Sequence, residues 1–90
     1  MLELKRTTQF RKDLKRVVKR GLNIDLLDDI VQKLRERKTL DPKHHDHALT
    51  GDYAGFRECH IQPNWLLIYI IDGKNIILTV TRTGTHSDLF

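Results

Sequence analysis

The first half of the chain carries apolar residues at the spacing of two amphipathic helices. The first helix is expected to begin at Thr7 or Thr8, since either side chain can cap it, and to end at Gly21. The second is expected to begin after Asn23, another capping residue, and to continue until residues 40–42, where proline stops it. Helices joined so closely should form a hairpin. The apolar positions are Phe10, Leu14, Val17 and Val18 in the first helix, and Leu27, Ile30, Val31 and Leu34 in the second.

The second half of the chain has the composition of β-strands, interrupted by turn residues. The expected strands span residues 53–61, 65–71 and 76–82. The Pro-Asn pair at 63–64 fits a turn between the first two, and the Asp-Gly pair at 72–73 suits a tight hairpin between the last two. Residues 2–6 are expected to form a short edge strand. Residues 42–51 lack periodicity and are expected to form a loop.

These elements predict an α+β fold in which the helical hairpin covers one face of an antiparallel sheet and leaves the other face free. A chain of 90 residues buries enough surface for one core, so residues 1–90 should form a single domain. No apolar run approaches the roughly 20 residues of a membrane span. The first ten residues lack the apolar stretch of a signal peptide. A cytoplasmic protein with no membrane partner is expected.

Alternation along the strands assigns side chains to the two faces of the sheet. Cys59 is expected to point toward the helices, so Glu58 and His60 should lie on the uncovered face. A carboxylate and an imidazole there form a candidate site. Arg82 has the parity of Val80 and should face the helices, unless a β-bulge or the end of the strand re-aims it.

The distribution of charge adds a second feature. Of 16 Lys and Arg residues, 8 lie between Lys5 and Arg20, where only Asp13 opposes them. Such a segment attracts polyanions or an acidic protein, although a solvated helix face is the plainer alternative. We call this set the basic stripe; it consists of Lys5, Arg6, Arg11, Lys12, Lys15, Arg16, Lys19 and Arg20.

Five histidines widen the candidate chemistry, because imidazole titrates at about pH 6.5 and exchanges protons at neutral pH. Each histidine taken alone also fits an ordinary surface role. The run "HHDH" at residues 44–47 offers ligands for zinc, but its spacing matches no helical metal motif. Cys59 is the only cysteine, which excludes an intramolecular disulfide and a thiolate cage.

The motifs "DHALTG", "FRECHIQPNWLLIY" and "RTGTHSDLF" together resemble the YafQ branch of the RelE superfamily of bacterial toxins. The resemblance covers essentially the whole chain. It implies a RelE-like fold and a ribosome-dependent endoribonuclease that cuts mRNA in the decoding site and is silenced by a cognate antitoxin. The residues that it places in the site are His47, His60, His86 and Arg82, with Trp65 and Phe90 in supporting or substrate-contacting roles.

The implied reaction suits these residue types. Cleavage through the 2′-hydroxyl of RNA needs a base for that proton, an acid for the departing 5′-oxygen and positive charge on the phosphorane. We expect His86 to be the general acid and either His60 or His47 to be the base. Arg82 should bind the phosphate, and Glu58 should orient an imidazole or a cation. This set needs no metal and no other cofactor.

The substrate is expected to touch two further regions. The basic stripe, through Lys12, Lys15 and Arg16, should dock on ribosomal RNA, while Phe90 stacks an mRNA base. Asn64 stands where the family usually has an acidic residue, and an amide there can bind RNA or serve the turn but cannot exchange a proton. The antitoxin should be acidic.

Two alternatives remain open from the sequence. A non-catalytic RNA- or ribosome-binding module would need the basic stripe but not the histidines. A purely structural interaction subunit would need neither.

Overall fold

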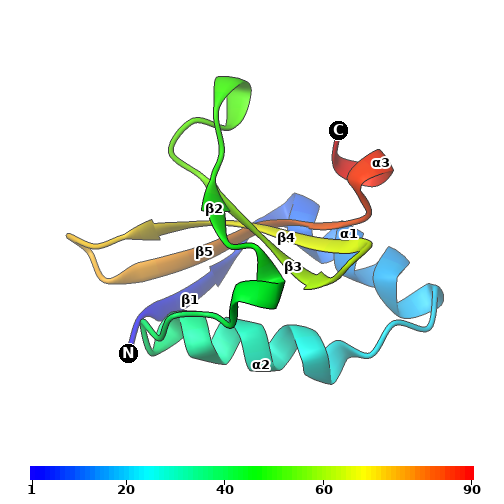
Figure 1. Cartoon of the computed structure of the whole chain (residues 1–90), viewed down its shortest axis with the longest axis horizontal. Helices are drawn as coiled ribbons and strands as arrows, with labels where there is room; N and C mark the ends of the chain where they lie inside the picture. Colours follow the sequence, from blue (N-terminus) through cyan, green and yellow to red (C-terminus); the bar gives the residue numbers. More distant parts are fainter.

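The computed structural model describes residues 1–90 as a five-stranded sheet in the order β1-β5-β4-β3-β2 (Figure 1). Neighbouring strands are antiparallel except β1 and β5, so the expected antiparallel sheet has one parallel pair at its edge. No helix is long and apolar enough to cross a membrane. The elements are β1 (Glu3–Arg6), α1 (Thr8–Lys19), α2 (Ile24–Arg35), η1 (Pro42–His44), β2 (His47–Ala48), η2 (Gly51–Tyr53), β3 (Arg57–Gln62), β4 (Trp65–Asp72), β5 (Ile77–Gly84) and α3 (His86–Leu89).

The two long helices begin at the predicted caps. The Thr7 side chain accepts a hydrogen bond from the backbone N–H of Phe10, and the Asn23 side chain accepts one from Asp25. The second helix ends at Arg35, earlier than expected. Arg37 adopts a left-handed conformation with φ of 57°, and its N–H bonds back to the carbonyl of Leu34, which closes the helix.

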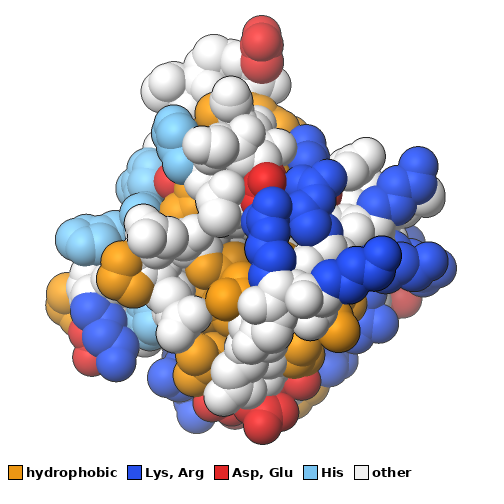
Figure 2. All heavy atoms as spheres, turned by 90° about the vertical axis from the view of Figure 1, so that its right-hand side faces the viewer, with side chains coloured by type: hydrophobic (Ala, Val, Ile, Leu, Met, Phe, Trp, Pro, Cys, Tyr) orange, Lys and Arg blue, Asp and Glu red, His pale blue; other side chains and the backbone are white.

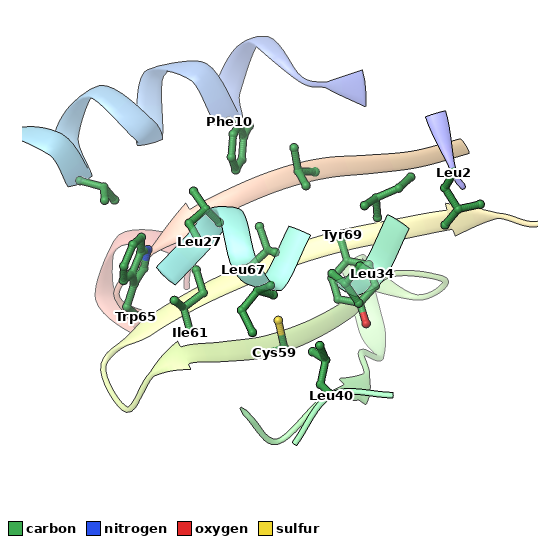
Figure 3. Packing of buried hydrophobic residues seen from close by; sticks show 14 residues of the cluster. Leu2, Phe10, Leu27, Leu34, Leu40, Cys59, Ile61, Trp65, Leu67 and Tyr69 are labelled. Carbon is green, nitrogen blue, oxygen red and sulfur yellow. The ribbon is translucent and has the colours of Figure 1, made fainter. Parts of the chain in front are cut away.

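Both long helices contribute to one hydrophobic core against the sheet. Figure 3 shows Phe10 of α1 and Leu27 of α2 directed toward the strands, where Trp65 and Leu67 of β4 are buried. The predicted apolar positions lie at this interface with one exception. Val18 is 55% exposed, because it lies on the solvent side of α1.

The opposite face of the sheet, which we call the outer face, is partly covered. Leu66 and Ile68 of β4 are buried there against Leu89 of α3, and Tyr53 and Phe56 pack at the margin. The expectation of a free face is therefore corrected: in Figure 1, α3 and the segment carrying η2 rise from this side of the sheet.

Several strand boundaries differ from the prediction. The turn η2 delays the start of β3 until Arg57, and the residues expected to form a loop include the short strand β2. The connection between β4 and β5 has four residues, 73–76, instead of a two-residue turn. Asp72 accepts hydrogen bonds from the backbone N–H groups of Lys74 and Asn75, which stabilises this longer turn.

Candidate active site

A carboxylate between two imidazoles lies on the outer face. His47 of β2 pairs with Glu58 of β3, and His60 lies two residues further along the same strand face. The Oε1 atom of Glu58 is 3.6 Å from Nε2 of His47 and 3.9 Å from Nε2 of His60. Glu58 is buried whereas the His47 side chain is 50% exposed. The sheet therefore brings two imidazole rings close to one carboxylate.

Backbone carbonyls orient both rings. The Nδ1 atom of His47 is 2.6 Å from the carbonyl oxygen of His45, and Nδ1 of His60 is 3.3 Å from that of Pro63. A carbonyl only accepts hydrogen bonds, so the ring proton lies on Nδ1 in each case. The Nε2 atom beside Glu58 is then the position at which each ring takes up or releases a proton.

The third predicted histidine faces the same region from the C-terminal helix. A groove of about 390 Å³ is lined by Glu58 and His60 of β3 together with His86 of α3. The ring of His86 lies 5.0 Å from that of Phe90, centre to centre, and Phe90 is 53% exposed. The full lining consists of Glu58, His60, Pro63, Asn64, Leu66, Thr85, His86 and Ser87.

Arg82 reaches the outer face because β5 contains a bulge. The pairing of β4 with β5 shifts between Ile68 and Tyr69, so that Ile68 lies opposite Arg82 and Tyr69 lies opposite Val80, with Thr81 as the extra residue. Opposed residues share a face, and Arg82 therefore lies on the side of Ile68 and not on that of Val80. The alternative that the sequence left open, re-aiming by a bulge, is the one observed.

Strand pairing aligns the site in two rows across the sheet. The first row runs Arg82, Ile68, Glu58 and His47 from β5 to β2, and the second places His60 beside Leu66. Adjacent strands lie about 4.8 Å apart. The rows therefore place a positive group, a carboxylate and imidazoles on the same face of the sheet, with the buried Ile68 between Arg82 and Glu58.

Comparison with known proteins identifies the family of this chain. The family model described as the bacterial toxin of type II toxin-antitoxin system, YafQ, matches residues 2–90. The chain belongs to the YafQ toxin family. The mRNA interferase toxin YafQ of Escherichia coli K12 is 36% identical over 83 residues, which is 91% of this chain and 88% of that protein.

Solved structures of the family have the same fold. A metal-bound toxin from Helicobacter pylori superimposes with a TM-score of 0.94 at 42% identity, over all of both chains. The E. coli DinJ-YafQ complex gives a TM-score of 0.90 at 32% identity, over 100% of this chain and 99% of that one. The RelE-like α+β fold expected from the sequence is thereby confirmed.

The YafQ-family tryptophan, Trp65, is part of the core. It is 1% exposed, and its indole N–H donates to the hydroxyl of Thr83 at 2.8 Å; that hydroxyl in turn donates to the carbonyl of Leu66 at 2.8 Å. A buried ring cannot stack on a base. Of the two roles expected for Trp65, this burial favours the supporting one, in which the ring joins the start of β4 to the end of β5.

The basic stripe divides into two parts. Lys12 and Lys15 are exposed and form no ion pair, whereas Arg16 lies 3.4 Å from Asp88 of α3. Arg20 forms a second contact with the same carboxylate, at 2.5 Å. In the view of Figure 2, most Lys and Arg side chains lie on the right and the histidines lie on the left. That part of the stripe holds the C-terminal helix is not apparent from any pattern in the sequence.

The loop histidines that matched no motif support His60. The Nδ1 atom of His44 lies 2.6 Å from the carbonyl oxygen of His60, and the His45 ring meets that of His60 edge-on at 5.5 Å. Asp46 accepts a hydrogen bond from the Tyr69 hydroxyl and pairs with Arg57, which fixes the loop before His47. Each residue of "HHDH" has a partner within the protein, and no group of three or more His, Cys, Asp or Glu side chains is placed to hold a metal.

Proposed function

We propose that this chain is a toxin that cleaves mRNA on the ribosome by 2′-hydroxyl attack, using histidines for proton transfer and Arg82 for charge stabilisation. The observation that carries the proposal is the groove that Glu58, His60 and His86 line together. The E. coli relatives are named mRNA interferase toxins, which supports RNA as the substrate.

The groove suggests a division of roles. The 2′-oxygen attacks phosphorus while a base removes its proton; the bond from phosphorus to the 5′-oxygen then breaks, and an acid protonates that oxygen. His60 is the better placed of the two candidate bases, because it lines the groove with His86 whereas His47 does not. His86 serves as the acid. Glu58 holds His47 and His60 in position and balances the charge that they gain.

Arg82 supplies positive charge where the phosphorane forms. It lies in the same cross-strand row as Glu58, separated from it by Ile68. An arginine is charged at every accessible pH and presents planar donors that match phosphate oxygens. Stabilising a developing charge in this way is among the largest contributions to catalysis.

The proposed reaction proceeds without a metal. Relatives from H. pylori have been solved in metal-bound and copper-bound forms. In this chain the donors nearest to a ligand set are Glu58 with His47 and His60, at 3.6 and 3.9 Å. These donor–donor distances are close to the roughly 3.4 Å between two ligands of a tetrahedral ion with bonds of about 2.1 Å, but no group of three or more His, Cys, Asp or Glu side chains is arranged to hold a metal in this structure. We assign no step to a metal.

The partners follow from the charges. Lys12 and Lys15 are exposed and unpaired, so they are available to ribosomal RNA. The structure of an E. coli DinJ-YafQ complex supports regulation by an antitoxin protein. With a net charge of +4 on this chain, an acidic antitoxin segment is the complementary partner.

The decisive test compares His86→Ala with Lys74→Ala, a control in the distant β4–β5 turn. Cleavage of ribosome-bound mRNA is followed by primer extension, together with ribosome binding and thermal unfolding. His86→Ala should fold and bind ribosomes but cleave about 10²- to 10⁴-fold more slowly. Full cleavage by folded His86→Ala would contradict the mechanism. Ribosome binding without cleavage by the wild type would instead favour a non-catalytic binding module.

A further inference from the structure

Asp13, the one acidic residue between Lys5 and Arg20, is buried, and both of its carboxylate oxygens accept hydrogen bonds. Asp13 of α1 has a side chain that is 0% exposed. It accepts hydrogen bonds from Nε of Arg82 at 2.7 Å and from Nη2 of Arg82 at 3.2 Å. Gln9 and the backbone N–H of Thr83 donate to it at 3.1 and 3.2 Å. Burial alone would raise the pKa of Asp13, but these hydrogen bonds lower it below the ordinary value, so the carboxylate is charged.

The hydrogen bonds to Asp13 determine the orientation of the Arg82 guanidinium. The carboxylate engages Nε and Nη2 of the guanidinium as a fork, which fixes the plane of the group. Asp13 does not engage Nη1, and the Tyr53 side chain is a further neighbour of the guanidinium. The hydrogen bond to Asp13 also raises the pKa of Arg82, and burial opposes it, so the positive charge is retained.

The bulge that aims Arg82 is held by the same helix. Thr7, the cap of α1, donates its hydroxyl hydrogen to the carbonyl of Thr81 at 2.7 Å, and its backbone N–H donates to that of Val80 at 3.2 Å. The first two turns of α1 therefore satisfy the irregular backbone of β5 and anchor the side chain that follows it.

We propose that Asp13 is a positioning residue for RNA cleavage, which acts by holding the Arg82 guanidinium in the orientation that binds the scissile phosphate. This inference rests on the proposed function, because it takes Arg82 to be the residue that stabilises the phosphorane. Asp13, the buried acid of the otherwise basic helix α1, thereby has a role that neither docking on RNA nor packing of the core requires.

The matched substitution is Asp13→Asn, which keeps the shape of the side chain but removes its charge and replaces one acceptor by a donor. The guanidinium loses its fork and becomes free to turn. Single-turnover cleavage should fall about 10- to 100-fold, in line with the effect of small misplacements of reacting groups. The concentration of ribosome–mRNA complex at half-maximal rate should change little. Gln9→Ala, which removes a hydrogen bond from Asp13 without touching Arg82, should leave the rate unchanged.

A double-mutant cycle separates positioning from a general loss of structure. If Asp13 acts through Arg82, the variant that combines Asp13→Asn with Arg82→Ala should be no slower than Arg82→Ala alone. If the double variant were slower than Arg82→Ala by the same factor that Asp13→Asn causes alone, the two residues would act independently and the inference would be overturned. Wild-type activity of Arg82→Ala would also overturn it. Absence of cleavage by the wild type would instead overturn the proposed function and the inference with it.

Chemical rescue gives a second measurement that does not require Asp13→Asn to fold. Guanidinium ion added at non-denaturing concentration should restore part of the activity of Arg82→Ala, because the carboxylate fork remains to orient it. Methylammonium should not restore activity, because it lacks the planar pair of N–H donors that the Asp13 carboxylate would orient. Equal rescue by the two cations would show that charge alone is needed and would overturn the positioning role of Asp13.

Discussion

Asp88 of α3 accepts hydrogen bonds from both terminal nitrogens of Arg20, the residue that caps the C-terminus of α1, with Nη1 at 2.5 Å from Oδ2 and Nη2 at 3.0 Å from Oδ1. The same carboxylate accepts a hydrogen bond from the backbone N–H of Thr85 and closes a capping box around the helix. A four-residue helix has little stability of its own. This ion pair therefore fixes the segment that carries His86 and Phe90 above the sheet.

We predict that Asp88→Asn slows cleavage about 10-fold while the thermal midpoint changes little, because Arg20 is exposed but His86 loses its fixed position. The measurement is cleavage rate beside thermal unfolding. Asp52→Asn is the matched control, since Asp52 is an exposed acid that forms no ion pair or side-chain hydrogen bond. An unchanged rate would show that α3 holds its position without Asp88.

The pH dependence of this contact has a defined sign. The hydrogen bond from Arg20, followed by that from the Thr85 backbone, lowers the pKa of Asp88 well below its ordinary value. A lowered folded-state pKa means that the stabilisation is complete above the unfolded pKa of about 3.9 and is lost as pH falls further toward the folded value. The NMR signal of the Asp88 carboxyl carbon should therefore show no titration step of that carboxylate between about pH 5 and 9.

Gly84→Ala should disturb the position of α3 where Asp88 packs against the end of β5. Gly84 has φ of 153°, and a Cβ added there would lie 2.8 Å from Oδ2 and 3.0 Å from Cβ of Asp88. We expect a loss of about 1 to 3 kcal/mol in the free energy of unfolding from backbone strain and displacement of α3. Urea unfolding measures it. Gly73→Ala, which has no positive φ and whose nearest neighbour is 4.0 Å away, is the control and should change little.

Asn64→Asp tests the residue that departs from the usual family pattern. Asn64 lines the groove with His60 and His86, so a carboxylate there would stabilise a protonated imidazole. Cleavage should become faster, and the limb of the pH–rate profile that reports the imidazolium should move to higher pH over the range of about 5 to 9. An unchanged rate and profile would assign Asn64 to the turn alone.

Chelation tests the expected independence from metals. Cleavage by protein treated with EDTA and returned to chelator-free buffer should equal that of untreated protein, because histidines and Arg82 supply the proton transfers and the charge. Ribosome integrity is checked separately by sedimentation. Loss of activity that zinc or copper alone restores would contradict the mechanism and assign a metal to the His47 and Glu58 cluster.

Much of the site follows from short-range patterns in the sequence. The repeat of apolar residues at 3.6 positions and the caps Thr7 and Asn23 determine where α1 and α2 begin, because these contacts join residues within one helical turn. The two-residue period of β3 determines that Glu58 and His60 share a face opposite to Cys59. These features need no knowledge of distant segments.

The tertiary structure decides what lies next to those residues. The bulge at Thr81 reverses the face of Arg82, and a one-residue shift in pairing leaves no local mark in the sequence. Asp13 meets Arg82 and Arg20 meets Asp88 across 69 and 68 positions, respectively, so each pair exists only after α1 has packed against β5 and α3. Period and capping are properties of neighbours along the chain, and the sequence by itself determines them. The position of a charge relative to its partner depends on the packing of the whole sheet, which only the folded structure decides.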